Sequence, residues 1–284
     1  MSSRSAGARA LAHRRQLGRA MSYGAAAALL AVTLFPVLWL VQVSFKTDVE
    51  AMRVPPTILF VPTLDNYAAV FQGKFARSFV NSLVVSVSTT LTAMMLGVPA
   101  AYALSRASFG RSRGLALWVL TTRMAPPIAF AIPFFLAYRW LGLIDTVPGL
   151  LIIYWTFNLS LVIWMMRTFF DGIPRSLEEA AAIDGAGPLQ AFYRITLPLS
   201  GPGLATTAIF CFVFAWNDFF YALVLTRTRA LMAPVAIVNF MNYEGWEWGK
   251  IGASATMIML PVVVFALAVR RYLIRGLTAG ALKG

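Results

Sequence analysis

The amino-acid sequence predicts an all-α polytopic membrane protein with six transmembrane helices and both ends of the chain in the cytoplasm. Of its 284 residues, 59% are hydrophobic and only 12% are charged, whereas a soluble domain carries about 25% charged residues. The mean hydropathy is +0.72. Six apolar runs are each long enough to cross a hydrocarbon core of about 30 Å as a helix. Basic residues are also concentrated on one side of these runs, as the positive-inside rule requires.

The expected spans are apolar runs of roughly 20 residues or more. In order they are 22–44, 79–104, 114–138, 147–168, 202–225 and 251–273. They divide the chain into a basic tail (1–21), the first span (22–44), an extracytoplasmic segment (45–78), a core of five spans (79–273) and a short tail (274–284). Arg123 and the pair Pro126–Pro127 interrupt the third run. Such breaks survive in a bilayer only where protein or a water-filled cavity satisfies the freed backbone groups.

The lysines and arginines set the orientation of these spans. With the N-terminus inside, 15 of the 24 fall in the inner segments and eight in the outer ones, while Arg123 lies within a span. This bias predicts that both termini are cytoplasmic and that the chain is a multi-pass protein of the cytoplasmic (inner) membrane. Basic flanks beside spans also account for the net charge of +13, so we expect a lipid bilayer and no nucleic acid as partner.

The first run could instead be a cleaved signal peptide. Its apolar stretch is about twice as long as an ordinary signal-peptide core, and Pro36 and Trp39 stand where a small-residue cleavage site would be needed. We therefore expect an uncleaved anchor. The single cysteine, Cys211, excludes an internal disulfide, and the single histidine, His13, lies in the basic tail. We accordingly assign no catalytic and no metal-binding residue.

A polar stretch, "SLEEAAAIDGAGPLQAFYRITLPLSGPG", separates the fourth and fifth spans on the cytoplasmic side. Ser176 followed by Glu179 is the spacing of a capping box, which predicts a helix start. Gly185 suits the left-handed end of that helix, and Pro188 fits the first turn of a second one. In the second helix Leu189, Phe192 and Tyr193 are spaced to share a face. These features predict two short helices joined by a glycine turn, and an amphipathic connector lying on the headgroups explains them equally well.

The spacing within this stretch resembles the EAA loop of binding-protein-dependent ABC importer permeases. The pattern E-A-A-x(3)-G-x(9)-I-x-L-P is met in full from Glu179 to Pro198. The stretches "FVNSLVVS", "LPLSGPGL" and "FAWNDFFYAL" and the C-terminal "GLTAGALKG" are similar to the MalG-like carbohydrate subgroup of that family. The resemblance covers essentially the whole chain after the first 20 residues.

The resemblance implies a type I importer fold in which the loop 170–200 is a coupling element that docks on an ATP-binding subunit. The motif positions implied for this coupling are Glu179, Ala180, Ala181, Asp184, Gly185, Ala186, Ile195, Leu197 and Pro198. Glu179 has a second possible role as the partner of Ser176 in the cap. The implied partners are a second homologous permease subunit, two copies of the ATP-binding subunit, and an extracytoplasmic solute-binding protein that would dock on outer loops including 45–78 and 226–250.

The chain is not expected to be an enzyme, because the phosphate-cradling pattern G-x-x-x-x-G-K-[ST] is absent from the sequence. No cofactor is expected on this chain, and ATP and Mg²⁺ would be bound by the partner ATPase subunits. The alternatives are an importer permease for another small polar solute and a secondary transporter. A secondary transporter would place coupling carboxylates near the middle of the membrane, and Asp218 is the only acidic residue within an expected span.

Polar groups inside spans are the candidates for contact with the transported solute, because they usually face a cavity or a neighbouring helix. They are Asn81, Ser82, Arg123, Tyr154, Asn158, Trp216, Asn217 and Asp218. For each of them the alternative is a hydrogen bond between helices. The resemblance implies a sugar or sugar alcohol as substrate, and an uncharged hydroxylated solute fits a pathway with few charges.

Overall fold

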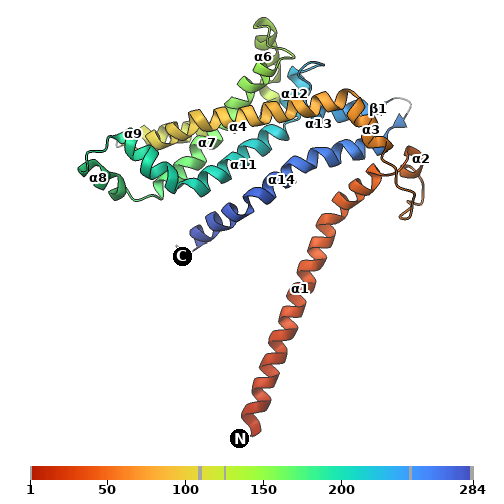
Figure 1. Cartoon of the computed structure of the whole chain (residues 1–284), viewed down its shortest axis with the longest axis horizontal. Coiled ribbons are helices and arrows are strands. Elements are labelled where there is room, and N and C mark those ends of the chain that lie inside the picture. Colours follow the sequence, from red (N-terminus) through yellow and green to blue (C-terminus); the bar gives the residue numbers. More distant parts are fainter. Residues whose placement is uncertain (1, 108–110, 125, 243–244, 282–284) are drawn as a thin grey trace.

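The computed structural model describes residues 2–107, 111–124, 126–242 and 245–281. Its centre is a bundle of helices that lie side by side (Figure 1): α4 (Lys74–Arg106), α7 (Val147–Asp171), α11 (Gly201–Trp216) and α14 (Trp248–Ala281). The long helix α1 (Ser2–Ser44) approaches α14 at its C-terminal end and diverges from the bundle toward its N-terminus (Figure 1). Gly252 permits this approach, because a Cβ there would lie 2.9 Å from the backbone nitrogen of Ser44.

Four helices of the described chain are long and apolar enough to cross a membrane: Gly18–Ser44, Lys74–Arg106, Val147–Asp171 and Trp248–Ala268. They match the first, second, fourth and sixth predicted spans. A fifth arises if Pro188–Leu199 and Gly201–Trp216, which meet at 77°, are taken as one bent span. The described chain is therefore mostly helical, with four or five candidate spans rather than six continuous ones.

The third and fifth predicted spans are each divided in two. The third becomes α5 (Arg111–Thr121) and α6 (Pro127–Trp140), and the predicted interruption near Arg123 is confirmed. Its physical cause is Pro127, which lacks an N–H group and is suited to begin a helix rather than to continue one. The fifth becomes α11 and α12 (Phe220–Leu225), because the chain leaves the helix at Asn217 and re-enters it after Phe219.

The two ends of the bundle carry different short elements (Figure 1). One end carries α2 (Asp48–Ala51), α3 (Asp65–Gln72), α13 (Ala233–Ala236), the 3₁₀-helix η2 (Ile237–Phe240) and an antiparallel hairpin of β1 (Met241–Asn242) and β2 (Gly245–Trp246). The other carries α8 (Ser176–Ile183), α9 (Pro188–Ala191), the π-helix η1 (Phe192–Thr196) and α10 (Leu197–Leu199). The hairpin, which pairs Met241 with Trp246, departs from the all-α prediction.

Close packing between α4 and α7 forms much of the core. A Cβ at Gly97 would lie 2.6 Å from a methyl group of Val162, so only glycine lets the two helices approach this closely. Toward the α8 end, buried Met166, Phe170 and Phe192 extend this core. Dense packing of this kind makes the two helices move together, because interiors at native density transmit displacement.

The loop between α6 and α7 is fastened to the loop after α12 by one carboxylate. Asp145, at φ 58°, accepts hydrogen bonds from four consecutive backbone N–H groups, those of residues 227–230, at 2.9–3.1 Å. Burial alone would raise the pKa of the Asp145 carboxyl, but these four donors outweigh it and lower the pKa from 3.8 to about 2. This interaction, here called the Asp145 clasp, was not predicted from the sequence.

The lowered pKa gives the Asp145 clasp a predictable pH dependence. The Asp145 carboxyl is more acidic in the folded protein than in the unfolded one. Its contribution to the free energy of unfolding is therefore complete above the unfolded pKa of 3.8 and is lost as the pH falls toward about 2. We expect Asp145→Ala to lower the free energy of unfolding by about 1–2 kcal/mol at pH 7, allowing for solvent screening of a partly exposed group. Thermal unfolding in detergent should show the difference from wild type shrinking between pH 5 and pH 3, and a difference independent of pH would contradict this account.

Candidate functional site

The helix α8 begins differently from the prediction. Arg175 stands at the N-cap position with helical angles, φ −63° and ψ −27°, and no side-chain hydrogen bond caps this described helix. Because the backbone N–H groups of Glu178 and Glu179 both donate to the Arg175 carbonyl, at 2.9 and 3.0 Å, Ser176 lies inside the helix. The predicted capping box between Ser176 and Glu179 is therefore wrong. The Glu179 side chain does not cap α8 and is exposed.

The glycine turn after α8 is confirmed. Gly185 has φ +87°, and its N–H donates to the carbonyl of Ala182 at 3.0 Å, while the N–H of Ala186 donates to that of Ala181 at 2.9 Å. This pair of bonds is a Schellman motif, which ends a helix with one left-handed residue. Pro188 then occupies the first turn of α9, as predicted.

The second helix runs through α9, η1 and α10 rather than as one α-helix. In the π-helix η1 the N–H of Leu197 donates to the carbonyl of Phe192. The prediction that Leu189, Phe192 and Tyr193 share one face is wrong, because Leu189 and Tyr193 are 73% and 60% exposed whereas Phe192 is buried. The Phe192 ring packs 4.6 Å from that of Tyr102 on α4.

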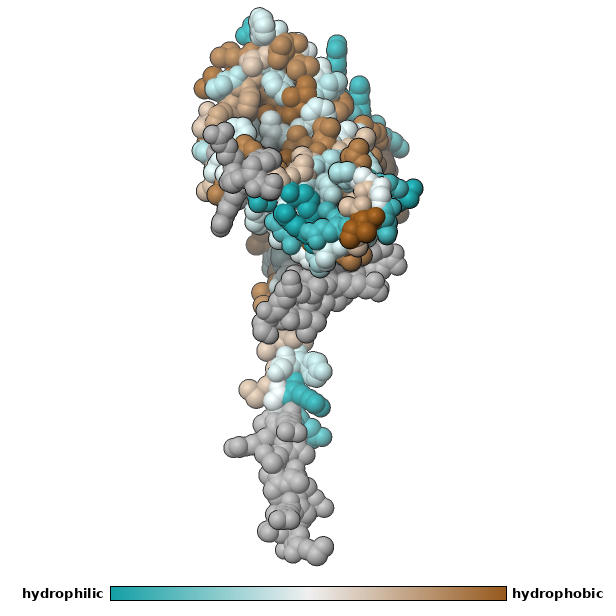
Figure 2. Space-filling view, turned by 90° about the vertical axis from the view of Figure 1, so that its left-hand side faces the viewer, coloured by the Kyte–Doolittle hydropathy of each residue, from teal (hydrophilic) through white to brown (hydrophobic). Residues whose placement is uncertain are grey.

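The predicted coupling residues surround this turn at one end of the bundle. Glu179, Ala180, Asp184, Gly185 and Pro198 are exposed, and Ala181, Ala186, Ile195 and Leu197 are half-buried. Figure 2 looks onto this end, where hydrophilic and hydrophobic side chains lie next to each other. The sequence pattern did not single out Ile183, yet 88% of this apolar side chain is exposed at the end of α8. Exposed apolar groups rimmed by polar ones are typical of protein-binding surfaces.

A second carboxylate, Glu178, was also missed by sequence reasoning. It forms an ion pair with Arg106 at 2.8 Å, and each side chain is only 14% exposed. Thr196 and Tyr102 donate further hydrogen bonds to it, at 2.5 and 3.1 Å. Burial alone would raise the pKa of Glu178, but the bonds from Arg106 and Thr196 outweigh it and lower that pKa. The available signal was the doubled glutamate, since the family pattern uses only Glu179.

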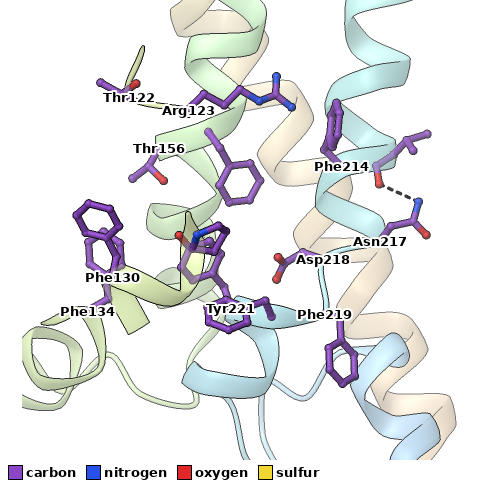
Figure 3. Close-up of a pocket in the computed structure, with 14 residues that line it drawn as sticks. Thr122, Arg123, Phe130, Phe134, Thr156, Phe214, Asn217, Asp218, Phe219 and Tyr221 are labelled. Atoms are coloured by element: carbon purple, nitrogen blue, oxygen red, sulfur yellow. Dashed lines mark hydrogen bonds between the residues drawn. The ribbon is translucent and has the colours of Figure 1, made fainter. Parts of the chain in front are cut away.

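The two helix breaks open onto a cavity of about 1020 Å³. Its lining comes from both breaks, from α6 and α7, and from the facing parts of α11 and α12 (Figure 3): Thr122, Arg123, Pro127, Phe130, Phe134, Thr156, Phe157, Val213, Phe214, Asn217, Asp218, Phe219, Phe220 and Tyr221. Broken helices that border a cavity are the usual location of solute sites in transporters. This cavity is here called the solute pocket.

Polar groups in the solute pocket are few and partly oriented by their neighbours. The Arg123 guanidinium lies 4.4 Å from the centre of the Phe214 ring, a cation–π contact. Asp218 accepts hydrogen bonds from the Tyr154 hydroxyl at 2.9 Å and the Ala222 N–H at 3.0 Å. Asn217 donates to the Val213 carbonyl of its own helix (Figure 3). The arrangement offers ring faces and a few donors and acceptors.

The structure brings Arg123, Asn217 and Asp218 together in the pocket, with Tyr154 joined through Asp218, and places the other four candidates elsewhere. Asn81 donates to the carbonyls of Arg229 and Leu231, at 2.9 and 3.1 Å. The remaining three also bond to neighbouring backbone: Ser82 accepts from the Ala233 N–H, Trp216 donates to the Ile258 carbonyl, and buried Asn158 donates to the Tyr154 carbonyl. The contacts of Asn81, Ser82 and Trp216 match the alternative of hydrogen bonds that join helices and loops, whereas the Asn158 bond lies within its own helix α7.

Comparison with known proteins identifies relatives along most of the chain. Residues 93–279 match the family described as "Binding-protein-dependent transport system inner membrane component". The trehalose transport system permease protein SugB of Mycobacterium tuberculosis is 43% identical over 258 residues, covering 88% of this chain and 93% of that protein. The trehalose/maltose transport system permease protein MalG of Thermococcus litoralis is 35% identical, covering 89% and 92%.

Solved structures of ABC transporters share the fold. A chain of the bacterial ABC transporter that imports the acidic polysaccharide alginate superimposes with a TM-score of 0.74 at 27% identity, covering 90% of this chain and 96% of that one. A chain of the MetNI methionine ABC transporter, at 17% identity, reaches a TM-score of 0.59 over 71% of this chain and 95% of that one. The second likeness concerns the fold alone.

The glycine turn can be tested against a matched neighbour. Gly185 and Gly187 both have open space for a side chain, since no atom would lie within 4 Å of an added Cβ, but only Gly185 of the two has positive φ. We expect Gly185→Ala to destabilise the turn by about 1 kcal/mol, which corresponds to roughly fivefold faster amide hydrogen exchange at residues 185 and 186. Gly187→Ala, at φ −73°, should leave exchange there unchanged. Equal effects of the two substitutions would contradict the assigned turn.

Proposed function

Because the chain belongs to the family of binding-protein-dependent transport system inner membrane components, we propose that it is the permease subunit of an ATP-driven importer for a sugar or sugar alcohol. The solute is delivered by an extracytoplasmic binding protein and crosses the membrane by alternating access. The observation that carries this proposal is the exposed α8–Gly185–α9 turn at one end of the bundle, which holds the E-A-A-x(3)-G part of the pattern, while the I-x-L-P part follows in η1 and α10.

We propose six spans with both termini in the cytoplasm, the third formed by α5 and α6 and the fifth by α11 and α12. In this topology 1–21 and 274–284 are cytoplasmic tails, 22–44 is the first span, 45–78 is extracytoplasmic and 79–273 is the permease core. The opposite placement of α8 and of the β1–β2 hairpin along the bundle supports this orientation (Figure 1). Interrupted spans are tolerated because both interruptions line the solute pocket.

The turn around Gly185 is the proposed docking surface for an ATP-binding subunit, which supplies ATP and Mg²⁺ and performs the hydrolysis. Small side chains at Ala180, Ala181 and Ala186 permit close approach of another protein, and exposed Ile183 and Glu179 offer an apolar and an acidic contact. The complete complex has a second homologous permease subunit and two ATPase copies, so that two such surfaces are engaged. The binding protein docks at the opposite end, on 45–78 and 226–250.

A carbohydrate substrate is supported by two observations. The relatives' names refer to trehalose, to trehalose and maltose, and to α-glucosides. The solute pocket combines aromatic faces with the polar groups of Asn217 and Asp218, and this combination suits a ring that carries hydroxyl groups. Arg123 favours one variation on this substrate, a carbohydrate with a negative charge, and a 32% identical relative from Agrobacterium fabrum is named for sulfoquinovosyl glycerol transport. A secondary transporter is not supported, since Asp218 is already engaged by Tyr154 and the Ala222 N–H.

If α8 is the docking surface, substitutions of two exposed isoleucines should affect ATPase association differently. Ile183 is 88% exposed on α8, and Ile58 is 74% exposed in the 45–78 segment at the other end. Ile183→Ser should weaken ATPase association about tenfold, because an apolar contact of this size is removed. Ile58→Ser should leave that association unchanged. The measurement is the ATPase retained by the solubilised permease across a dilution series, and an equal response of the two variants would rule out docking on α8.

The solute pocket predicts a difference between two asparagines. Asn217→Ala removes a pocket side chain whose hydrogen bond lies within its own helix, so the complex should assemble normally while the apparent KM for the sugar rises about fivefold. Asn81→Ala removes two bonds to the loop at 229–231, outside the pocket, and should lower thermal stability without changing that KM. Uptake of labelled sugar by proteoliposomes measures both. An unchanged KM in Asn217→Ala would exclude this pocket as the solute site.

A further inference from the structure

The helix α8 is not held in place by apolar packing. None of its described residues is buried, and its two large apolar side chains, Leu177 and Ile183, are 43% and 88% exposed. A helix of eight residues is too short to be stable by itself in water. Covalently, α8 is joined to α7 through residues 172–175 and to α11 through α9, η1 and α10, but α4 is not its neighbour in the chain.

Side-chain bonds of Glu178 link α8 to α4. Nε of Arg106 donates to both carboxylate oxygens at 3.0 Å, and an Nη atom of Arg106 donates to Oε1 at 2.8 Å. Arg106 is the last residue of α4, and Tyr102, one turn earlier, donates to the same carboxylate. Thr196 of η1 completes the set. Three elements distant in sequence therefore meet on one carboxylate on the inner side of α8.

Arg106 extends this connection to the end of α7. Its Nη atoms donate to the carbonyl of Phe170 at 3.0 Å and to that of Ile173 at 3.4 Å. The last carbonyl groups of a helix have no partner within the helix, so a guanidinium placed there satisfies them and complements the helix dipole. Arg106 thus connects the inner ends of α4 and α7 to α8, and the Ser105 hydroxyl adds a bond from α4 to Asp171 of α7.

The other end of α4 holds the extracytoplasmic loop. Asn81 donates to the carbonyls of Arg229 and Leu231, and the Ser82 hydroxyl accepts from the N–H of Ala233 at 2.8 Å. Between these contacts and Arg106, α4 is one continuous helix packed closely on α7 at Gly97. A displacement applied to its inner end is therefore delivered to the loop that precedes the β1–β2 hairpin.

We propose that the Glu178–Arg106 pair is the joint through which movement of α8 reaches α4, and through α4 the extracytoplasmic loop at 229–233. This inference rests on the proposed docking of an ATPase at α8. Glu178 is a positioning residue in this account: its side chain is only 14% exposed and is bonded to Arg106, while its neighbour Glu179 is exposed. Without the joint, Arg175 at the start of α8 still donates to the Ser105 carbonyl of α4 at 2.9 Å, but the rest of α8 could follow the ATPase while α4 stays behind.

The test separates assembly from coupling in the importer purified with its partner subunits. Glu178→Gln keeps the size of the side chain and removes its charge. We expect normal ATPase content but about tenfold less sugar transported per ATP hydrolysed, because the guanidinium of a nearly buried pair loses its partner. Tyr102→Phe and Thr196→Val each remove one hydroxyl donor to Glu178 and should lower the ratio about threefold. If the Glu178→Gln complex does not assemble, the two hydroxyl variants test the joint instead.

A matched control is Thr168→Val, since the exposed Thr168 donates only to the Trp164 carbonyl of its own helix among the described contacts. Its transport per ATP should equal that of wild type. A wild-type ratio in assembled Glu178→Gln, or in both hydroxyl variants, would overturn the joint. A wild-type permease that brings down no ATPase would instead refute the proposed function, so the two failures are distinguishable.

A distance measurement tests the joint without any transport assay. Spin labels at Leu96→Cys on α4 and Leu177→Cys on α8 occupy exposed positions, and the native Cys211 is buried. Double electron–electron resonance should give one narrow distribution of the distance between the two labels when Glu178 is present, with or without ATP, because α4 and α8 move as one body. Glu178→Gln should broaden it. Equally narrow distributions in the two proteins would overturn the proposal.

Discussion

Hydrocarbon cannot hydrogen-bond to a peptide backbone, and this constraint decides where the helices of this chain can be broken. The long helices α4, α7 and α14 run without interruption and are long and apolar enough to cross the membrane, although Pro99 and Pro261 each remove one backbone donor from α4 and α14. The breaks after Thr121 and after Trp216 release backbone groups, and both breaks border the same cavity. The cavity therefore lies where the two spans are interrupted, because the released backbone groups need partners other than lipid. Asp218 shows the compensation in detail, because its carboxylate accepts the N–H of Ala222 where α12 begins.

The same chemistry is used differently at the two ends of the bundle, where water and headgroups replace hydrocarbon. There charged side chains add hydrogen bonds to the apolar packing that holds short elements such as α3, α13 and η1. Asp145 gathers four consecutive backbone donors at one end, and Glu178 gathers Arg106, Tyr102 and Thr196 at the other. Each carboxylate has its pKa lowered because the bonds it accepts outweigh its burial. Carboxylates of this kind fix loops through charge-assisted hydrogen bonds, in addition to the apolar contacts beside them.

Patterns in the sequence predicted the features that depend on residues close together in the chain. Hydropathy located four of the spans, Pro126–Pro127 marked the break before α6, and Gly185 marked the left-handed turn. The capping box failed because Arg175 already adopts helical angles, so the helix includes the residue expected to cap it. Glu178 could not be assigned from the sequence, since its partner Arg106 lies 72 residues away and no periodicity links the two. The shared face of Leu189 and Phe192 failed for a similar reason, as packing against Tyr102 decided which ring is buried.

The continuity of α4 has a thermodynamic consequence. This helix contacts α8 through Arg106 at one end and the loop at 229–233 through Asn81 and Ser82 at the other. Two binding sites joined by one rigid element have a coupling free energy, and that energy is the same whichever site is occupied first. In the proposed importer, a protein that docks on the outer loop changes the affinity of α8 for its own partner by the same factor by which that partner changes the outer docking. The proposed coupling across the membrane is therefore reciprocal: the arrival of solute outside and the state of the nucleotide inside each change the binding equilibrium of the other.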